Sequence, residues 1–256
     1  MKKKEASSYE WERFYSIRDF NNTDFWKTKS AAKPWIEKGV MSKPYPSGIY
    51  VYGFIEKING KNLFAPYYVG KSGNIFDRLY NHLAGLRGCS LAIFKRNEIF
   101  SIEKDFNNTK INKPLNYGSL SFFKNFLDDG QTNLGKEIRE EIDWMMQHWV
   151  VTWTIETNSE TRKELEREIG EVFDTKYLIT KIGSPQNSEE IPDQIKIEDM
   201  EDENSPNIDQ MKVKNQNKTM QRIISGDISN KQPFYVIEEK DCHEEARKIL
   251  THSQII

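Results

Sequence analysis

The sequence predicts a mixed α/β (α+β) fold in the order strand–strand–helix, insertion, strand–helix. Two runs rich in β-branched and aromatic residues flank an Asn-Gly pair, and amphipathic helical stretches follow the second and the last such run. At 256 residues, with 37% hydrophobic and 30% charged residues, the chain has room for one or two domains but is too polar to be packed throughout. We therefore expect a folded body with an unfolded tail.

The three expected strands span residues 47–56, 64–71 and 149–156. Each run is dominated by residues that favour strands. Asn59-Gly60 is the strongest short signal for a β-hairpin between the first two strands, although residues 63–66 lengthen the return. These runs predict a hairpin, with the third strand arriving after an insertion.

Two helices are expected to flank the strands, at residues 73–86 and 159–179. The plausible N-caps are Asn74 for the first helix and Ser159 for the second. One face of the first helix carries Ile75, Leu79, His82 and Leu83, and one face of the second carries Leu165, Ile169, Val172 and Phe173. Both helices are therefore expected to pack on the strands.

Composition divides the chain into an N-terminal extension at 1–46, a body at 47–187 and an acidic, largely disordered tail at 188–256. The body carries an insertion at about 88–146, with amphipathic helical stretches expected near 119–128 and 135–147. These boundaries follow from shifts in apolar and aromatic content along the chain.

The tail is expected to be disordered over about 188–230, because it buries too little apolar surface to offset the entropy of ordering. Within it, residues 189–209 hold nine acidic residues and one lysine, a local net charge of −8. Since residues 210–256 carry +2 and the whole chain −2, residues 1–188 carry +4. Residues 233–239 and 244–250 could form a strand and a short helix that dock on the body or fold against a partner protein.

Several classes of protein are disfavoured by the sequence. No window approaches the roughly 18 apolar residues of a membrane-spanning helix, and the basic N-terminus has no apolar segment behind it. Cys89 and Cys242 are too far apart in sequence to suggest a disulfide framework or a zinc cluster, and the four histidines are scattered. We expect no membrane association and a reducing, cytoplasmic setting.

A succession of motif residues occupies the hairpin and the helix after it. Gly48-Ile49-Tyr50 opens the first strand, Tyr68-Val69-Gly70 closes the second, and Lys71 follows at once. Arg78 and His82 then lie four residues apart on one helical face. This succession resembles the GIY-YIG nuclease family, with YVG in place of YIG. The resemblance covers about 47–187 without the insertion, and implies a small three-stranded antiparallel sheet flanked by helices.

The resemblance also implies a metal-binding glutamate on the helix after the third strand. Glu166 fits best, because apolar residues lie at positions −1, +3 and +7 from it, and Glu168 is the competitor. Pro185 and Asn187 fit the proline and asparagine that close the family pattern, although their distance from Glu166 is longer than usual.

These residues imply a metal-dependent endonuclease that hydrolyses DNA phosphodiester bonds. Glu166 would hold Mg²⁺ (or Mn²⁺) as a Lewis acid on the scissile phosphate, and Arg78 would bind that phosphate. Tyr50 could act as general base only if the metal, Lys71 and Arg78 lower its pKa. Tyr68 and His82 would position the water or relay its proton.

Each of these residues also has a simpler interpretation as a packing or surface residue. The alternative function is a catalytically inactive nucleic-acid-binding or scaffold module on the same fold. Aromatic and basic residues in 8–45, Trp11 among them, either line a nucleic-acid groove or, for the tryptophans, pack on the sheet. Partners other than DNA stay open: a homodimer, or a protein bound by the tail.

Overall fold

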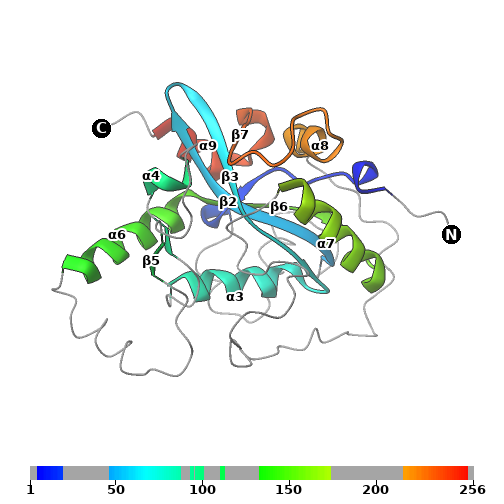
Figure 1. Cartoon of the computed structure of the whole chain (residues 1–256), viewed down its shortest axis with the longest axis horizontal. Helices are drawn as coiled ribbons and strands as arrows, with labels where there is room; N and C mark the ends of the chain where they lie inside the picture. Colours follow the sequence, from blue (N-terminus) through cyan, green and yellow to red (C-terminus); the bar gives the residue numbers. More distant parts are fainter. Residues whose placement is uncertain are drawn as a thin grey trace.

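Five antiparallel strands form the main sheet of the computed structural model (Figure 1). The structure describes residues 5–19, 46–87, 93–94, 96–100, 110–112, 133–173 and 216–252. In spatial order the strands are β1 (Tyr15–Ser16), β6 (Trp149–Ile155), β2 (Gly48–Ile58), β3 (Lys61–Ser72) and β7 (Tyr235–Val236). A separate pair joins β4 (Ile93–Phe94) to β5 (Lys110–Asn112).

The three predicted strands are confirmed as β2, β3 and β6, the middle of the sheet, but the expectation of only three strands is wrong. The added edge strands β1 and β7 are two residues long and come from the two terminal segments. Strand β7 lies within residues 233–239, which the sequence allowed as a strand. Strand β1 is too short to show alternation of apolar and polar side chains, so no sequence pattern marks it.

The β2–β3 hairpin closes with a two-residue turn. Asn59 and Gly60 both have positive φ, 49° and 74°, as a type I′ turn requires. Ile58 pairs directly with Lys61. Residues 63–66 therefore belong to β3. The expectation that they lengthen the loop is wrong.

The register of this hairpin changes by one residue at Tyr67. On the turn side of the change Gly53 pairs with Pro66, and on the other side Tyr52 pairs with Tyr68. Tyr67 is thus the extra residue of a β-bulge. A bulge also tolerates proline inside a strand, because the regular ladder of N–H donors is already interrupted there.

The bulge decides the face on which Tyr68 lies. Tyr50 pairs with Gly70, and directly opposed residues share a face. If the register near the turn continued unchanged, Val69 would face Tyr50 and Tyr68 would turn to the other side. The bulge instead places Tyr50 and Tyr68 in one buried cluster.

Helices cover both faces of the sheet (Figure 1). On the tyrosine face, which carries Tyr50, Tyr52, Tyr67 and Tyr68, lie α3 (Ile75–Arg87) and α6 (Asn133–His148). On the opposite, terminal face lie α7 (Ser159–Phe173), α8 (Lys218–Ile224) and α9 (Glu244–His252). Helix α6 confirms the stretch expected near 135–147, whereas 119–128 lies outside the described residues. None of the described helices has the length and apolar character needed to cross a membrane.

The buried face of α7 is the predicted one, but its N-cap is not. Leu165, Ile169 and Phe173 are buried. Asn158 caps the helix: its Oδ1 accepts from the Thr161 backbone N–H at 2.9 Å and its carbonyl accepts from the next turn. The expectation of Ser159 as the cap is corrected by one position.

Within the insertion, α4 (Arg96–Ile99) is anchored to β2. The Arg96 guanidinium forms an ion pair with the buried Glu56 carboxylate and lies over the Trp144 ring, 5.7 Å from its centroid. The Arg96 backbone N–H donates to Glu141 at 3.0 Å. The described part of the insertion is therefore held against the tyrosine face.

Residues 216–252 fold onto the terminal face, so the prediction of disorder is wrong over 216–230. Helix α8 buries Met220, Ile223 and Ile224. Residues 174–215 lie outside the described part, while 233–239 and 244–250 dock on the body as the sequence allowed. The apolar surface missing from the tail itself is supplied by the sheet and by residues 5–19.

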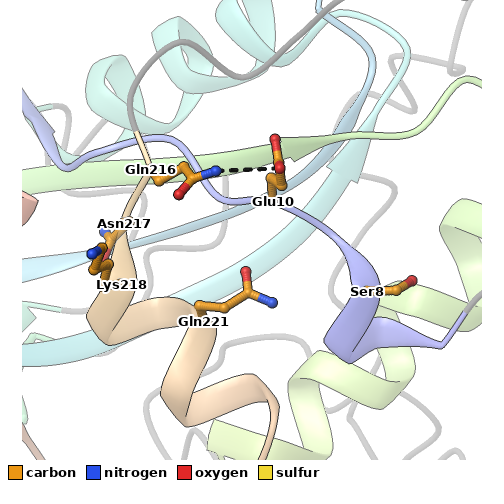
Figure 2. A pocket seen from close by; sticks show the side chains of 6 residues that line it. All are labelled: Ser8, Glu10, Gln216, Asn217, Lys218 and Gln221. Atoms are coloured by element: carbon orange, nitrogen blue, oxygen red, sulfur yellow. Dashed lines mark hydrogen bonds between the residues drawn. The ribbon is translucent and has the colours of Figure 1, made fainter.

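The two terminal segments contact each other directly. The buried Trp11 and Phe14 belong to the same cluster as α8 and α9, so neither is free to line a nucleic-acid groove. A polar cleft of about 320 Å³ lies where the segments meet, with Gln216 donating to Glu10 at 3.3 Å (Figure 2). Its lining residues are Ser8, Glu10, Gln216, Asn217, Lys218 and Gln221, which include none of the motif residues.

A buried carboxylate also ties the N-terminal segment to α9. Asp19 accepts hydrogen bonds from the Ser16 backbone N–H at 2.7 Å, from the Glu245 backbone N–H at 3.0 Å and from His243 Nδ1 at 2.6 Å. Burial alone would raise the pKa of Asp19, but the hydrogen bonds from His243, Ser16 and Glu245 lower it overall.

We predict that Leu250→Ala lowers the free energy of unfolding by about 2–5 kcal/mol, because Leu250 of α9 is 0% exposed and its loss leaves a cavity. Urea denaturation measures the change. Val236→Ala is the control, since Val236 is 57% exposed and should change stability by less than about 0.5 kcal/mol. Equal, small effects of both changes would show that α9 does not contribute to the folded core.

We predict that Asp19→Asn lowers the free energy of unfolding at pH 7 by about 1–3 kcal/mol, because the amide turns a donor toward groups that donate to the carboxylate. A lowered pKa means that the Asp19 contribution is present above the unfolded value, near 4, and is lost as pH falls below it. The variant should therefore lose less stability between about pH 5 and pH 2. Urea denaturation across that range measures the change, and Asp227→Asn is the control because Asp227 is exposed. The prediction is contradicted if the wild type and both variants lose stability equally as pH falls.

Candidate active site

The candidate site lies where α3 crosses the tyrosine face of the hairpin. Helix α3 begins after Asn74, whose carbonyl accepts from the Arg78 backbone N–H at 3.2 Å, as expected of an N-cap position. Ile75 and Leu79 are both buried, so the side of the helix that carries them faces the sheet. The neighbouring positions, Arg78 and His82, thereby reach the tyrosines.

A hydrogen bond between Tyr50 and His82 is at the centre of this site. Tyr50 Oη lies 2.8 Å from His82 Nε2. The Tyr68 ring lies 4.5 Å from the imidazole and 6.0 Å from the Tyr50 ring, centroid to centroid. Two strands and one helix thus bring together three of the residues that the sequence singled out.

Gly48 and Gly70 of the motif must be glycine because neighbouring atoms lie where a Cβ would be. A Cβ at Gly70 would lie 2.5 Å from Tyr50 Oη and 2.5 Å from Tyr68 Cε1. A Cβ at Gly48 would collide with the carbonyl oxygen of Thr154 on β6. Gly70 therefore provides the space for both tyrosine side chains, and Gly48 allows β2 and β6 to pair at the entrance to the site.

Arg78 supplies positive charge beside Tyr50. Burial raises the pKa of Tyr50 well above its usual value and nearby Tyr68 adds to this, whereas the charge of Arg78 and its side-chain hydrogen bond act to lower it. The balance keeps the Tyr50 phenol protonated at neutral pH.

His82 is uncharged at neutral pH. Removal from water, together with the Arg78 charge, lowers the pKa of His82 to about 3. A neutral imidazole can accept a hydrogen bond at one ring nitrogen, so the Tyr50 hydroxyl donates and His82 Nε2 accepts.

The two candidate glutamates of α7 act on different groups. The Glu166 carboxylate is close enough to Tyr50 to raise its pKa, whereas Glu168 acts on Tyr9 of the N-terminal segment. Tyr9 donates to Glu156 at 2.5 Å on the terminal side of the sheet. The charge of Glu166 therefore acts on Tyr50, although α7 itself packs on the opposite, terminal face of the sheet.

Lys71 does not join this group. It pairs with Ile49, which belongs to the terminal face, and so lies on the side of β3 opposite Gly70. Its charge acts on Glu160 at the start of α7. The sequence analysis expected a metal, Lys71 and Arg78 together to lower the pKa of Tyr50; of these, the structure places the charge of Arg78 beside Tyr50. Pro185 and Asn187 lie outside the described residues.

The metal-binding capacity of the site rests on a single carboxylate. Within the described ranges no group of three or more His, Cys, Asp or Glu side chains could hold an ion. Mg²⁺ commonly binds through one or two carboxylates, with water and substrate phosphate as its other ligands. The half-buried Glu166 fits that limited requirement.

The tyrosines of the site are more deeply buried than its other residues. Tyr50 is 0% exposed and Tyr68 is 8% exposed. Arg78, His82 and Glu166 are only partly buried. A phosphate could therefore reach the charged groups first, with the Tyr50 hydroxyl behind them.

The sequence analysis did not single out two tyrosines of this face. Tyr52 and Tyr67 stack on each other at 5.6 Å, and Tyr52 stacks on Tyr68 at 5.3 Å. The alternation of β2 could have placed Tyr52 next to Tyr50, and the register set by the turn would already place Tyr67 opposite Tyr52. The bulge adds Tyr68 to the same face.

No family model, no curated protein and no solved structure matches this chain. The interpretation of the site therefore rests on its own residues and their geometry.

We predict that Gly70→Ala destabilises the protein and displaces the two tyrosines, because the new methyl group has no room beside Tyr50 and Tyr68. Overpacking of this kind costs about 1–3 kcal/mol. Gly73→Ala is the matched control, since the nearest atom to a Cβ there is Arg162 Nη2 at 4.0 Å. Thermal denaturation compares the two, and equal melting temperatures would show that the tyrosines do not confine Gly70.

Proposed function

We propose that this chain is a metal-dependent endonuclease of the GIY-YIG type, which hydrolyses phosphodiester bonds in DNA. The observation that carries the proposal is the Tyr50–His82 hydrogen bond, with the Arg78 guanidinium beside Tyr50 and the Glu166 carboxylate near enough for its charge to act on Tyr50. A phenol, an imidazole, a guanidinium and a carboxylate together provide the groups that phosphodiester hydrolysis needs.

The substrate is recognised first by its charge. The net charge of +4 on residues 1–188 favours a polyanion, and Arg78 is accessible enough to bind a phosphate. A guanidinium bound to the scissile phosphate also offsets the negative charge that develops in the transition state.

Proton transfer in this site begins at Tyr50. Its hydroxyl donates to the neutral His82 Nε2, which orients the phenol. To accept a proton from the attacking water, Tyr50 must first lose its own proton to solvent. The adjacent Arg78 charge favours the phenolate, while burial opposes it. Glu166 would hold the divalent ion, which when bound supplies a Lewis acid to the phosphate.

One observation favours the alternative, an inactive nucleic-acid-binding or scaffold module. Tyr50 is buried as deeply as any core residue. If it served only packing, Tyr50→Phe would leave DNA binding unchanged and would alter only stability, through the lost hydrogen bond to His82. Metal-dependent nicking of supercoiled plasmid separates the two functions.

We predict that the wild-type protein nicks supercoiled plasmid with Mg²⁺ but not with EDTA, and that Glu166→Gln slows nicking by roughly 10³-fold or more. The amide keeps the shape of the side chain but removes the charge that a hard cation requires. Binding of DNA, measured by gel shift, should be unchanged because it rests on lysine and arginine contacts to phosphate.

Glu168→Gln is the matched control and should nick at nearly the wild-type rate, because Glu168 acts on Tyr9 and not on Tyr50. If only Glu168→Gln is inactive, the metal ligand is Glu168. If the wild type binds DNA without nicking it under any metal, the protein is a binding module.

A further inference from the structure

Glu156 lies at the start of the helix that carries the candidate metal ligand. It follows β6 directly, and Asn158, the cap of α7, comes two residues later. One carboxylate oxygen of Glu156, Oε1, accepts from the Asn158 backbone N–H at 2.8 Å. Its carbonyl oxygen accepts from Arg162 Nη1, in the first turn of α7, at 3.3 Å. Glu156 therefore holds the loop from which α7 begins.

The same residue is bonded to the segment that leads into the first motif strand. The Glu156 backbone N–H donates to the Ser47 carbonyl at 2.9 Å, and the Glu156 carbonyl accepts from Ser47 Oγ at 2.9 Å. Ser47 comes directly before Gly48-Ile49-Tyr50. The start of α7 is thus tied to the strand that carries Tyr50.

The second carboxylate oxygen of Glu156 is bound by the N-terminal segment. Tyr9 is 2% exposed, and its hydroxyl donates to Glu156 Oε2 at 2.5 Å. Burial raises the pKa of Tyr9 and the hydrogen bond to Glu156 adds to this, so the phenol stays protonated and remains a donor. One carboxylate therefore joins a residue far away in the sequence to the cap of α7.

The position of Glu166 is sensitive to where α7 begins. Glu166 lies seven residues beyond Ser159, about 10 Å along the helix, so a change of about 10° in direction at the start displaces it by about 2 Å. The ligands of a functional site must be held within about 0.5 Å. The apolar contacts of α7 with the sheet are non-directional, and so they do not specify this start by themselves.

The first turn of α7 also faces the segment between β3 and α3. Arg162 is 9% exposed and lies one turn before Glu166 on the same side of the helix. A Cβ at Gly73, which follows β3, would lie 4.0 Å from Arg162 Nη2. The start of α7 is therefore next to the segment that leads into the helix of Arg78 and His82.

We propose that Tyr9 and Glu156 are positioning residues for Glu166. The hydrogen bonds from Tyr9 through Glu156 to Asn158 fix the start of α7, and the helix then holds the Glu166 carboxylate where its charge acts on Tyr50. This inference rests on the proposed nuclease function. It makes the N-terminal segment a requirement for metal binding, although that segment supplies no metal ligand.

The test is Tyr9→Phe in the full-length protein, with binding of Mn²⁺ alone followed by electron paramagnetic resonance. Only the part of the binding that Glu166→Gln abolishes is counted. The Kd for Mn²⁺ should rise about 10-fold, as when a residue that orients a metal ligand is lost. The Mg²⁺ concentration for half-maximal nicking should rise equally, with a nearly wild-type rate at saturating Mg²⁺.

Tyr235→Phe is the matched control for a lost hydroxyl at the other end of α7. The Tyr235 hydroxyl accepts from the Gln232 backbone N–H at 3.2 Å, and its ring contacts that of Phe173 at 5.7 Å. This variant also loses a hydrogen bond but should bind Mn²⁺ as the wild type does. A purely structural role of Tyr9 would make the two variants alike.

Substitutions of Glu156 separate its hydrogen bonds from its charge. Glu156→Ala removes both hydrogen bonds of the carboxylate, and Tyr9→Phe should cause no further loss of affinity in that background. In Glu156→Gln the amide oxygen accepts from the Asn158 N–H and the amide nitrogen donates to the Tyr9 hydroxyl, so Mn²⁺ binding should be retained. If Glu156→Gln binds as weakly as Glu156→Ala, the charge of Glu156 is what matters and the inference is overturned.

The remaining outcomes are equally decisive. An unchanged Kd in Tyr9→Phe, or losses from Tyr9→Phe and Glu156→Ala that multiply, would also overturn the inference. If the wild type still binds Mn²⁺ through Glu166, such a result rejects the roles of Tyr9 and Glu156 alone. If the wild type shows no binding that depends on Glu166, the proposed function is rejected together with the inference.

Discussion

Without the extra residue at Tyr67, the hairpin would present Tyr50 and Tyr68 on opposite faces of the sheet. The bulge moves the register by one position, and with it Tyr68 and Gly70 come to lie beside Tyr50. Helix α3 can then bring one histidine against both tyrosines. The Asn59-Gly60 turn sets the register of the hairpin near the turn, and the bulge shifts that register by one residue. Two local features 7 residues apart, at 60 and 67, therefore determine the geometry of the whole site.

The tyrosine face differs in chemistry from the terminal face. The terminal face is closed by α7, α8 and α9 with largely apolar side chains, while the tyrosine face buries phenols, an imidazole and, nearer the turn, the ion pair of Glu56 with Arg96. Buried polar groups cost stability unless they are satisfied. The apolar packing of the terminal face therefore offsets the cost of a polar interior on the other side.

The sequence predicted whatever depends on local pattern: the three central strands, the Asn-Gly turn, the apolar faces of α3 and α7, and the motif residues around Tyr50. It could not predict features that depend on contacts between distant residues. Strand β1 forms because it pairs with the edge of the sheet at β6, and α8 is ordered because Met220 packs in the same buried cluster as Trp11. The bulge at Tyr67 and the turning of Lys71 to the other face follow from pairing geometry, which composition and periodicity do not report.

The contact between Asp19 and His243 has a consequence for the synthesis of the protein. The two residues are 224 positions apart in the sequence. The Asn217 backbone N–H also donates a hydrogen bond to the Trp11 carbonyl, over a similar sequence separation. A ribosome therefore adds more than 200 residues after the N-terminal segment before the terminal face of the sheet can be fully covered. Contacts of such long sequence separation also slow folding. Prematurely terminated chains would expose the apolar residues of β2 and α7, and should be recognised by chaperones and proteases as unfinished.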